Sequence, residues 1–511
     1  MRNGDGGSGN DLPGFEGVHG RKVDETLRHT EPKPRLIPVN RNQMRIVPVD
    51  VERLIGEEHE ARAIWSFVGR LDLASYYQEI GSVEGEGGRP AYDPQVLMSV
   101  WIYGYSKGIG SAREIARRTE YDPAFQWIAA MEIINYHTLS DFRISHKESL
   151  DRVFIEVLGV LSAEGLIALE RTTQDGTKVK ACAGTGSFRK EATIMAHLKA
   201  AREQVRLLQE SEEEASLREQ KAHIRAAHER KERLDRAFEE LKKVQRAGAR
   251  ASMTDPDARN MKQSDGGYAP SYNLQISADS AHDIIIAQKI SQHPEDFKEL
   301  LPAVERIEDN TGKKPRQMIA DGGYTTRENI IAMAEREVEF IGSLDGRTPS
   351  HPGQFASRGI DDAFRPDRFT YDAELAVYLC PQGKVLRHRS TQKRAGKVRS
   401  IFSARARDCQ ACSSNGKCCP QGKRRSIVRT LEHAAINEFA KKMKTEEAKE
   451  IYKTRAPIAE FPHAWIKEKI GLRQFHVRGL LKVGMEALWA CLTYNIQQWI
   501  RLCWRPRLAA G

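Results

Sequence analysis

Apolar residues recur at helical spacing between residues 65 and 143, and turn signals separate the runs. Asp93-Pro94 and Asp122-Pro123 each combine a capping side chain with a proline suited to the first turn of a helix. Short basic helices joined by tight turns are typical of a helix-turn-helix, in which Arg143 and His146 would lie near a DNA groove. An ordinary helical bundle explains the same pattern.

Two heptad patterns of apolar residues follow and predict a pair of helices. The first comprises Ile194, Leu198, Ala201, Val205 and Leu208, and the second comprises Ile224, Ala227, Leu234, Phe238 and Leu241. They are out of phase across Ser211-Glu-Glu-Glu214, which we interpret as the turn of an antiparallel hairpin. An insertion between two strands of one sheet must return close to where it left, which favours this interpretation.

Short apolar and alternating runs predict the strands of an α/β domain. They are Leu166–Lys180, Tyr272–Ser277, Ile284–Ile290, the run ending at Ala320, and Val338–Ile341. Helical stretches at 294–308 and 326–336 separate the last three strands. The order is three strands, helix, strand, helix, strand, which indicates a mixed sheet with flanking helices and a leading antiparallel hairpin.

Three carboxylates from distant segments are candidates for chemistry. Asp321 follows an apolar run and precedes two glycines and the helix cap Thr326, which places it at the C-terminal lip of a strand. Asp175 falls in the first predicted strand and Glu460 in the last helical block. Three such carboxylates suit a site for two divalent metals that acts at phosphorus. Taken singly, each Asp-Gly is also a common turn signal, and Glu460 a solvated side chain.

Charge is distributed unevenly along the chain, which has 511 residues and a formal net charge of +10. From Lys384 to Arg429 there are 14 Lys or Arg and one acidic residue, Asp408. This stretch, which includes Arg424 and Arg425, indicates nucleic acid as the partner because neutralising phosphates supplies most non-specific affinity. A solvated loop is the alternative, since helix and strand signals fade between Gly342 and Arg429.

Cysteines in the same segment suggest a metal site. Cys409-Gln-Ala-Cys412 has metal-ligand spacing, and Cys380, Cys409, Cys412 and one of Cys418 or Cys419 would complete a tetrahedral zinc site. Four free thiols are the alternative. The N-terminus has no apolar core typical of a signal peptide, so we expect reduced or metal-bound cysteines in a cytosolic bacterial protein. Charged and amide side chains interrupt the apolar segment from Leu480 to Trp504, which predicts a packed helix rather than a membrane span.

These patterns divide the chain into five regions. Residues 1–45 are expected to be a disordered tail, 46–160 a helical domain, and 161–342 with 430–505 an α/β core. The helical hairpin occupies 186–250 within that core, and a basic, cysteine-containing insertion occupies 343–429.

Several motifs together resemble the DDE transposases of bacterial insertion sequences, whose catalytic domain has the RNase H-like, retroviral-integrase-like fold. Tyr452 and Arg455 match the first half of a Tyr-x2-Arg, Glu-x6-Lys signature, and Glu460 with Lys467 matches the second half. Four residues separate Arg455 from Glu460, where the stricter pattern has three. Further matches are Asp-Gly-Thr at Asp175, Ala-Asp-Gly-Gly-Tyr at Asp321 and Phe475-His-Val-Arg-Gly-Leu480, and the likeness covers roughly residues 45 to 503.

The resemblance implies that Asp175, Asp321 and Glu460 bind two Mg2+ ions, or Mn2+ in vitro. They would cleave DNA at each end of the element and transfer the freed 3′-hydroxyl to target DNA. Arg455 and Lys467 would hold phosphates, and Tyr452 a terminal nucleotide. The helix-turn-helix candidate and the basic segment would read the terminal inverted repeats of double-stranded DNA. Pairing two ends implies at least a homodimer, with the helical hairpin as the candidate interface.

Two other functions fit parts of the pattern. One is a DNA-binding regulator without catalysis, which predicts the loss of at least one carboxylate, whereas all three stand in their motif contexts here. The other is a metal-dependent nuclease that hydrolyses DNA without joining it. The same two metals serve hydrolysis and strand transfer, so the products of the reaction distinguish the two.

Overall fold

The computed structural model describes residues 41–42, 44, 48–82, 90–210, 217–243, 248–343, 355, 357–372, 374–394, 397–431 and 433–510. The chain divides into two compact units, Met1–Asp50 and Val51–Gly511, and the elements below belong to the second. The predicted tail of residues 1–45 falls almost wholly outside the described residues.

The first part of this unit is helical, as the apolar spacing predicts. Its elements are the 3-10 helix η2 (Val51–Leu54), α1 (Glu60–Val68), α2 (Ala74–Gln78), α3 (Pro94–Ser106), α4 (Ala112–Tyr121), α5 (Pro123–Ile128), α6 (Tyr136–Ser145) and α7 (Lys147–Ala163). The Asp93 and Asp122 side chains accept hydrogen bonds from the backbone N–H groups of Gln95 and Ala124 and so cap α3 and α5. Both Asp-Pro signals therefore mark helix starts.

A six-stranded mixed sheet forms the centre of the unit. Its strands are β1 (Arg171–Lys180), β4 (Arg259–Lys262), β5 (Tyr268–Asp279), β6 (Ile285–Ser291), β7 (Gln317–Ala320) and β8 (Glu339–Gly342). β5 is antiparallel to β1 on one side and to β4 and β6 on the other, while β7 is parallel to both β1 and β8. The predicted mixed sheet with its leading antiparallel hairpin is confirmed.

Helices α10 (Leu300–Thr311) and α11 (Arg327–Glu335) alternate with the last strands in the predicted order. Thr326 caps α11 by accepting a hydrogen bond from the backbone N–H of Asn329. The first strand begins at Arg171 rather than at Leu166, because Leu169 adopts a positive φ of 56° and turns the chain just before it.

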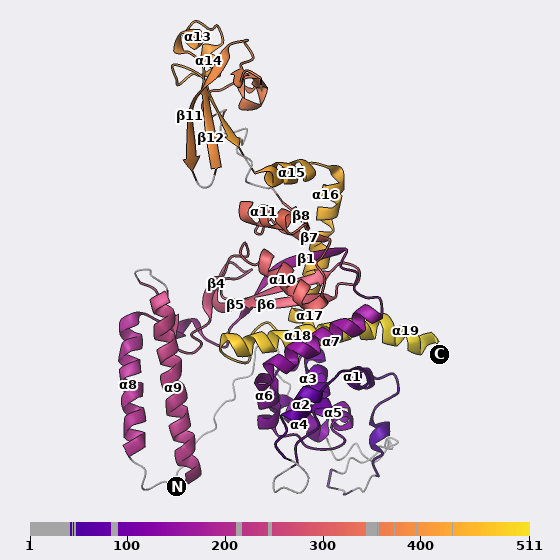
Figure 1. The fold of residues 1–511 in the computed structure, drawn as a ribbon. Coiled ribbons are helices and arrows are strands. Elements are labelled where there is room, and N and C mark those ends of the chain that lie inside the picture. The colour runs from indigo at the N-terminus through magenta and orange to yellow at the C-terminus, as the bar shows by residue number, and fades with distance from the viewer. Residues whose placement is uncertain are drawn as a thin grey trace, which may run out of the picture. The chain divides into compact units, whose positions relative to one another are not determined.

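The C-terminal block is again helical. It contains α15 (Ala434–Lys442), α16 (Glu446–Lys453), α17 (Arg455–Glu468), α18 (Leu480–Trp499), the π-helix η6 (Ile500–Trp504) and α19 (Arg505–Ala510). α18 packs against β6, α3 and α7 and is buried along most of its length (Figure 1). The packed helix predicted over Leu480 to Trp504 is confirmed. Among the residues described here, no helix is both long and apolar enough to cross a membrane.

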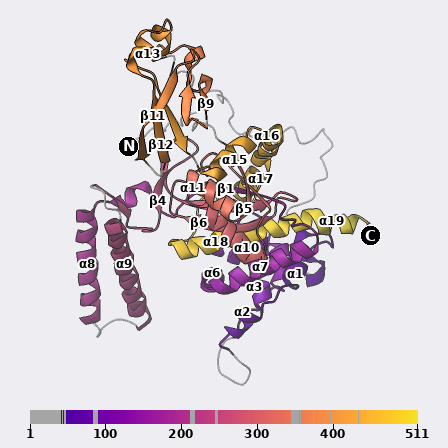
Figure 2. The ribbon, with the colours of Figure 1, turned by 45° about the horizontal axis from the view of Figure 1, so that its top comes forward.

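An antiparallel helical arm interrupts the sheet after β1. After the 3-10 helix η3 (Thr185–Ser187), the short pair β2 (Phe188–Arg189) and β3 (Ala251–Ser252) closes its base, and α8 (Glu191–Glu210) and α9 (Leu217–Lys243) run side by side (Figure 1, Figure 2). The heptad residues Leu198, Ala201 and Leu234 are buried between the two helices. The hairpin is therefore confirmed, although its predicted turn at 211–214 lies outside the described residues.

A second sheet lies where the sequence signals fade. After the 3-10 helices η4 (Asp362–Phe364) and η5 (Pro366–Arg368), strands β9 (Thr370–Asp372), β10 (Val377–Leu379), β11 (Val385–Arg394), β12 (Lys397–Ser403) and β13 (Ser426–Leu431) pair in the order β13-β12-β11-β10-β9. Short helices α13 (Ala406–Gln410) and α14 (Asn415–Cys418) connect β12 to β13. The solvated-loop alternative is wrong for this segment, because Leu386, Phe402 and Ile427 form a buried core beneath the sheet.

Candidate functional site

Asp175 lies inside β1 rather than in a turn. It pairs with Ile276 of β5, and its Oδ1 accepts a hydrogen bond of 2.8 Å from the backbone N–H of Gly176. Burial raises the pKa of Asp175 to about 6, against the opposing effects of the Gly176 N–H and the Arg455 guanidinium. The charge of Asp321 raises the same pKa further, which shows that the structure brings the two aspartates into one electrostatic environment.

Asp321 directly follows β7, as its sequence context predicts. Parallel pairing aligns Gln174 of β1 with Ala320 of β7, so Asp175 and Asp321 are the next residues on neighbouring strands. Asp321 Oδ1 accepts a 2.7 Å hydrogen bond from the backbone N–H of Gly323, which tightens the turn after the strand. The two carboxylates thus meet where the parallel strands stop pairing, the location that open α/β sheets use for chemistry.

Helix α17 packs against β1 and β5 and brings cationic groups to Asp175. Arg455 Nη1 lies 3.6 Å from Asp175 Oδ2. The Lys467 ammonium donates a hydrogen bond to the hydroxyl of Thr177, whose side chain shares a strand face with Asp175. Burial and the Arg473 charge lower the pKa of Lys467, and the charge of Asp175 opposes this. The family signature residues Arg455 and Lys467 therefore do converge on the first carboxylate.

Glu460 stands on the same helix with its side chain exposed. It is three residues before His463 and seven before Lys467, so all three share one face of α17. His463 is buried beside Asp175, and burial lowers its pKa to about 4. In the described part of the chain, no group of three or more His, Cys, Asp or Glu side chains already stands in a metal-holding arrangement. The structure thus joins the two aspartates and places Glu460 on the facing helix.

Tyr452 and Trp465 have mainly packing contacts. Tyr452 packs against the cluster formed by Ile319, Ile341 and Ala448. Trp465 packs between Phe461 and Tyr494 and donates a 2.6 Å hydrogen bond from its indole N–H to Gln497. The sequence motif names Tyr452 without showing that its ring packs against this cluster.

A polar network behind the sheet escaped the sequence analysis. Asp296 Oδ1 accepts hydrogen bonds from Asn273 (2.6 Å) and Gln275 (2.7 Å). Gln275 in turn accepts from Gln174 and from the hydroxyl of Tyr324. The network occupies the face of β1 and β5 opposite to Asp175, because residues 174 and 175 point to opposite sides of a strand. It links β1, β5 and the turn after Asp321 into one rigid unit.

Gly176 is the sequence signal for this network. A Cβ atom at Gly176 would lie 2.2 Å from Gln275 Nε2 and 2.6 Å from Asp296 Oδ1. The Asp-Gly-Thr motif therefore needs glycine for close packing inside a strand, not for a turn. The sequence predicted the strand, but the Asp-Gly pair taken singly does not reveal this close packing.

The five clustered cysteines line one small cavity of the insertion with Leu386 and Arg425. Backbone N–H groups of Lys384 and Arg425 donate to the sulfur atoms of Cys380 (3.2 Å) and Cys409 (3.4 Å). Burial raises the pKa of the Cys418 thiol to about 11. The eight cysteines of the chain are free of disulfides.

Two arginines predicted to contact DNA are buried instead. Arg143 is 5% exposed, lies 3.6 Å from the buried carboxylate of Glu486, and donates to the carbonyl of Gly110 at 2.7 Å. Arg425 is 8% exposed and donates to the carbonyl of Phe364. The structure therefore does not support DNA contact by either side chain, because internal partners hold both guanidinium groups inside the fold, although the Nε of each has no hydrogen-bond partner among the described residues. Arg424 is exposed, as a DNA contact requires.

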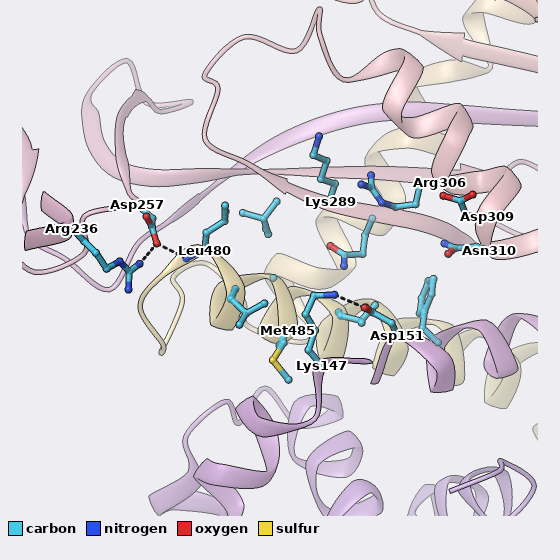
Figure 3. Close-up of a pocket in the computed structure, with 16 residues that line it drawn as sticks. Lys147, Asp151, Arg236, Asp257, Lys289, Arg306, Asp309, Asn310, Leu480 and Met485 are labelled. Carbon is cyan, nitrogen blue, oxygen red and sulfur yellow. Dashed lines mark hydrogen bonds and ion pairs between the residues drawn. The ribbon is translucent and has the colours of Figure 1, made fainter. Parts of the chain in front are cut away.

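A cavity of about 670 Å3 lies apart from the three carboxylates, between α7, α10, α18 and β6 (Figure 3). Its charged lining is largely paired: Lys147 with Asp151, Arg236 with Asp257, and Lys289 with Glu299. Its remaining lining is substantially apolar, including Leu480 and Met485. Paired charges and apolar walls do not suit a phosphodiester reaction, so we place the candidate site at Asp175 and Asp321.

Two family matches cover the ends of the unit. Residues 49–145 match the family described as Transposase domain (DUF772), and residues 379–500 match the Transposase DDE domain. No curated protein matches the chain. The second match contains Tyr452, Arg455, Glu460, Lys467 and the cysteine cluster, whereas Asp175 and Asp321 lie outside both matched ranges.

The two matches indicate that the class of protein is a transposase. Together they support an insertion-sequence DDE transposase, as the motifs around Asp321 and Glu460 predicted.

Proposed function

We propose that this chain cleaves DNA at the ends of an insertion sequence and transfers the freed 3′ ends to target DNA. The observation that carries the proposal is the placement of half-buried Asp175 beside Asp321, under a helix that supplies Arg455 and Lys467. Acidic side chains suit metal ligation, and the surrounding cations suit a phosphodiester substrate. A phosphodiester substrate would use both the metal-binding carboxylates and the neighbouring cations.

The strand order supports an RNase H-like core. Three antiparallel strands, β6, β5 and β1, are followed across the sheet by β7 and β8, which run parallel to β1. Asp175 stands on the central strand, and Asp321 directly follows the parallel neighbour of that strand. In this proposal α17 closes the site from one face, and the polar network around Gln275 stiffens the other.

Asp175, Asp321 and Glu460 would hold two Mg2+ ions, or Mn2+ in vitro, since carboxylate oxygens are the ligands that these ions prefer. The raised pKa of Asp175 fits this role, because partial burial disfavours the charged carboxylate and a bound cation would offset that cost. Such ions activate water and stabilise the leaving oxygen in phosphodiester displacement.

The chain's own cations would position the DNA. Arg455 balances the charge of Asp175 from 3.6 Å and can turn to a phosphate, because its side chain is 18% exposed. Lys467 is fixed by Thr177, which holds its ammonium beside the same carboxylate. His463 stays neutral and buried at physiological pH, so it contributes packing under the site rather than charge. Pairing two DNA ends would need at least a homodimer, for which the arm of α8 and α9 offers a surface.

An excision assay tests the proposal. Wild type, Asp321→Asn and the control Asp309→Asn would act on a marker flanked by the element's own ends. Asp309 is an exposed aspartate of α10 outside the site. We expect excision with wild type and the control, none with Asp321→Asn, and binding to end DNA by all three. Excision by Asp321→Asn would overturn the proposal.

Two alternatives give different outcomes. A DNA-binding regulator would bind end DNA without excision even as wild type. A nuclease would leave cut ends without joined products, which gel analysis of the target plasmid resolves. The geometry favours the enzyme over the regulator because Asp175 and Asp321 are both present and lie next to each other on neighbouring strands.

We also propose a structural Zn2+ in the insertion, held by Cys380, Cys409, Cys412 and one of Cys418 or Cys419. Their shared cavity and the backbone N–H groups directed at two of the sulfurs support this assignment. Backbone donors of this kind stabilise thiolates. The sulfurs would have to close in on the ion, since the described residues do not yet hold the metal geometry.

A further inference from the structure

The sheet of the insertion has two faces of different character. On the inner face, Leu386, Phe402 and Ile427 are buried, and the Arg429 guanidinium stacks 3.7 Å above the ring of Tyr371. The pairing register places the neighbouring residues on the outer face: Arg387 opposite Ser403 and Ser426, Ser390 opposite Ile401 and Val428, and Gln392 opposite Arg399.

The outer face is open and basic. Arg387, Arg389 and Arg399 are exposed, and Val428 at its centre is 52% exposed. Arg389 occupies the β-bulge between His388 and Ser390, so it has no pairing partner on β12. It adds a third exposed guanidinium group to this part of β11. Among the residues that the structure describes, none of these three arginines has an ion-pair partner.

We propose that the outer face of β11, β12 and β13 binds the backbone of double-stranded DNA. This inference rests on the proposed function and names the surface that receives the duplex. Charge complementarity carries it: free guanidinium groups alternate with serine hydroxyls and the Gln392 amide, the groups that proteins use for phosphate contacts.

The spacing of the outer face suits a duplex. Arg387 pairs with Ser403 of β12, which lies four residues from Arg399 on the same strand. At ~3.4 Å per residue, Arg387 and Arg399 are therefore separated by ~14 Å along the strands. The major groove is about 12 Å wide, so strands that cross it can present the two side chains to phosphates on its opposite edges. Antiparallel strands in a groove are an established way to bind DNA.

The inner face explains why a duplex fits better than a single strand. Single-stranded nucleic acid binds by stacking its bases on exposed aromatic rings. Here Tyr371, Tyr378 and Phe402 pack against one another on the inner face, and the outer positions named above carry no aromatic ring. The outer face therefore offers charge and hydrogen bonds without a stacking platform.

The test is a salt titration of DNA binding with the full chain. The variant Arg387→Gln, Arg389→Gln, Arg399→Gln would be compared with wild type on a fluorescent duplex of random sequence, without added divalent ions. A control removes three exposed cations from the arm: Lys199→Gln, Lys221→Gln, Arg225→Gln. We expect the slope of log affinity against log salt to fall by about 2 to 3 in the first variant, at ~0.9 per lost phosphate contact, and to hold in the control.

A second variant and a cleavage assay make the outcome decisive. Lysine at the same three positions keeps the charge and should restore the slope. Unchanged thermal unfolding would show that the glutamine variant is folded. The inference would be overturned if the glutamine variant kept the wild-type salt slope, or if the arm control lost as much of its slope as the glutamine variant does. If wild type cuts and binds DNA while the glutamine variant binds equally well, only this inference fails; if wild type neither binds nor cuts, the proposed function fails.

Discussion

Arg455 of α17 lies 3.6 Å from Asp175 of β1. This contact joins the helix of the Tyr-Arg-Glu-Lys signature to the strand of the Asp-Gly-Thr motif. The guanidinium lowers the pKa of Asp175 and so opposes the effect of burial, which dominates. Arg455 therefore helps to keep the first carboxylate ionised.

Replacing Arg455 by Gln should move the acidic limb of DNA cleavage to higher pH. The pKa of Asp175 is about 6 with Arg455 in place, and without this lowering influence it rises. Metal binding needs the ionised carboxylate, so at a fixed Mg2+ concentration activity would appear only at a higher pH than in wild type. Initial rates measured across pH check this, with Lys453→Gln as the control because Lys453 is exposed and pairs with Glu450. Identical pH profiles would remove Arg455 from this role.

Replacing Gly176 by Ala should destabilise the core by ~1 to 3 kcal/mol, the usual cost of overpacking. The new methyl group would collide with Gln275 Nε2 and Asp296 Oδ1 across the strand. Urea unfolding measures the change. Gly159→Ala is the matched control, because nothing lies within 4 Å of a Cβ there and alanine favours its helix. Equal free energies of unfolding for the two variants would show that Gln275 and Asp296 can move away from the new methyl group without destabilising the core.

Acid should destabilise the fold through His463. Its pKa is lowered to about 4 by burial, whereas an unfolded histidine titrates near 6.5. The folded state therefore keeps His463 neutral, and its stability falls as the pH drops from about 6.5 toward 4. The loss reaches ~3 kcal/mol at 1.36 kcal/mol per pKa unit.

Denaturant unfolding at several pH values tests this expectation. The variant His463→Leu should lose this part of the pH dependence, while replacing the exposed His137 by Leu should retain it. A His463→Leu protein with the wild-type pH dependence would assign the acid sensitivity to other groups.

Removing the proposed zinc should unfold the insertion. Purified wild type is expected to contain about one Zn2+ per chain, and Cys409→Ser with Cys412→Ser should contain none, because two of four ligands are lost. Cys182→Ser is the control, since Cys182 lies outside the cluster. Elemental analysis and limited proteolysis report the two effects. If the double variant contained as much Zn2+ per chain as wild type, these cysteines would not be the zinc ligands.

Local patterns along the chain determined much of the architecture. The caps at Asp93, Asp122 and Thr326, the helical arm and the strand that ends before Asp321 all follow from interactions between residues close in sequence. Capping, helical periodicity and strand alternation are local, so they can be deduced without a partner.

Tertiary packing decided which of these residues share a site and which are buried. The sequence context of Arg143 predicted a side chain facing a DNA groove, but in the structure Arg143 pairs with Glu486. The sequence placed Asp175 in a strand, but only the packing of β5 shows why Gly176 must follow it. The insertion was missed as a sheet because its strands are rich in cations and its few apolar residues gain their burial only from one another. Contacts between residues hundreds of positions apart arise from side-chain packing, which no local periodicity encodes.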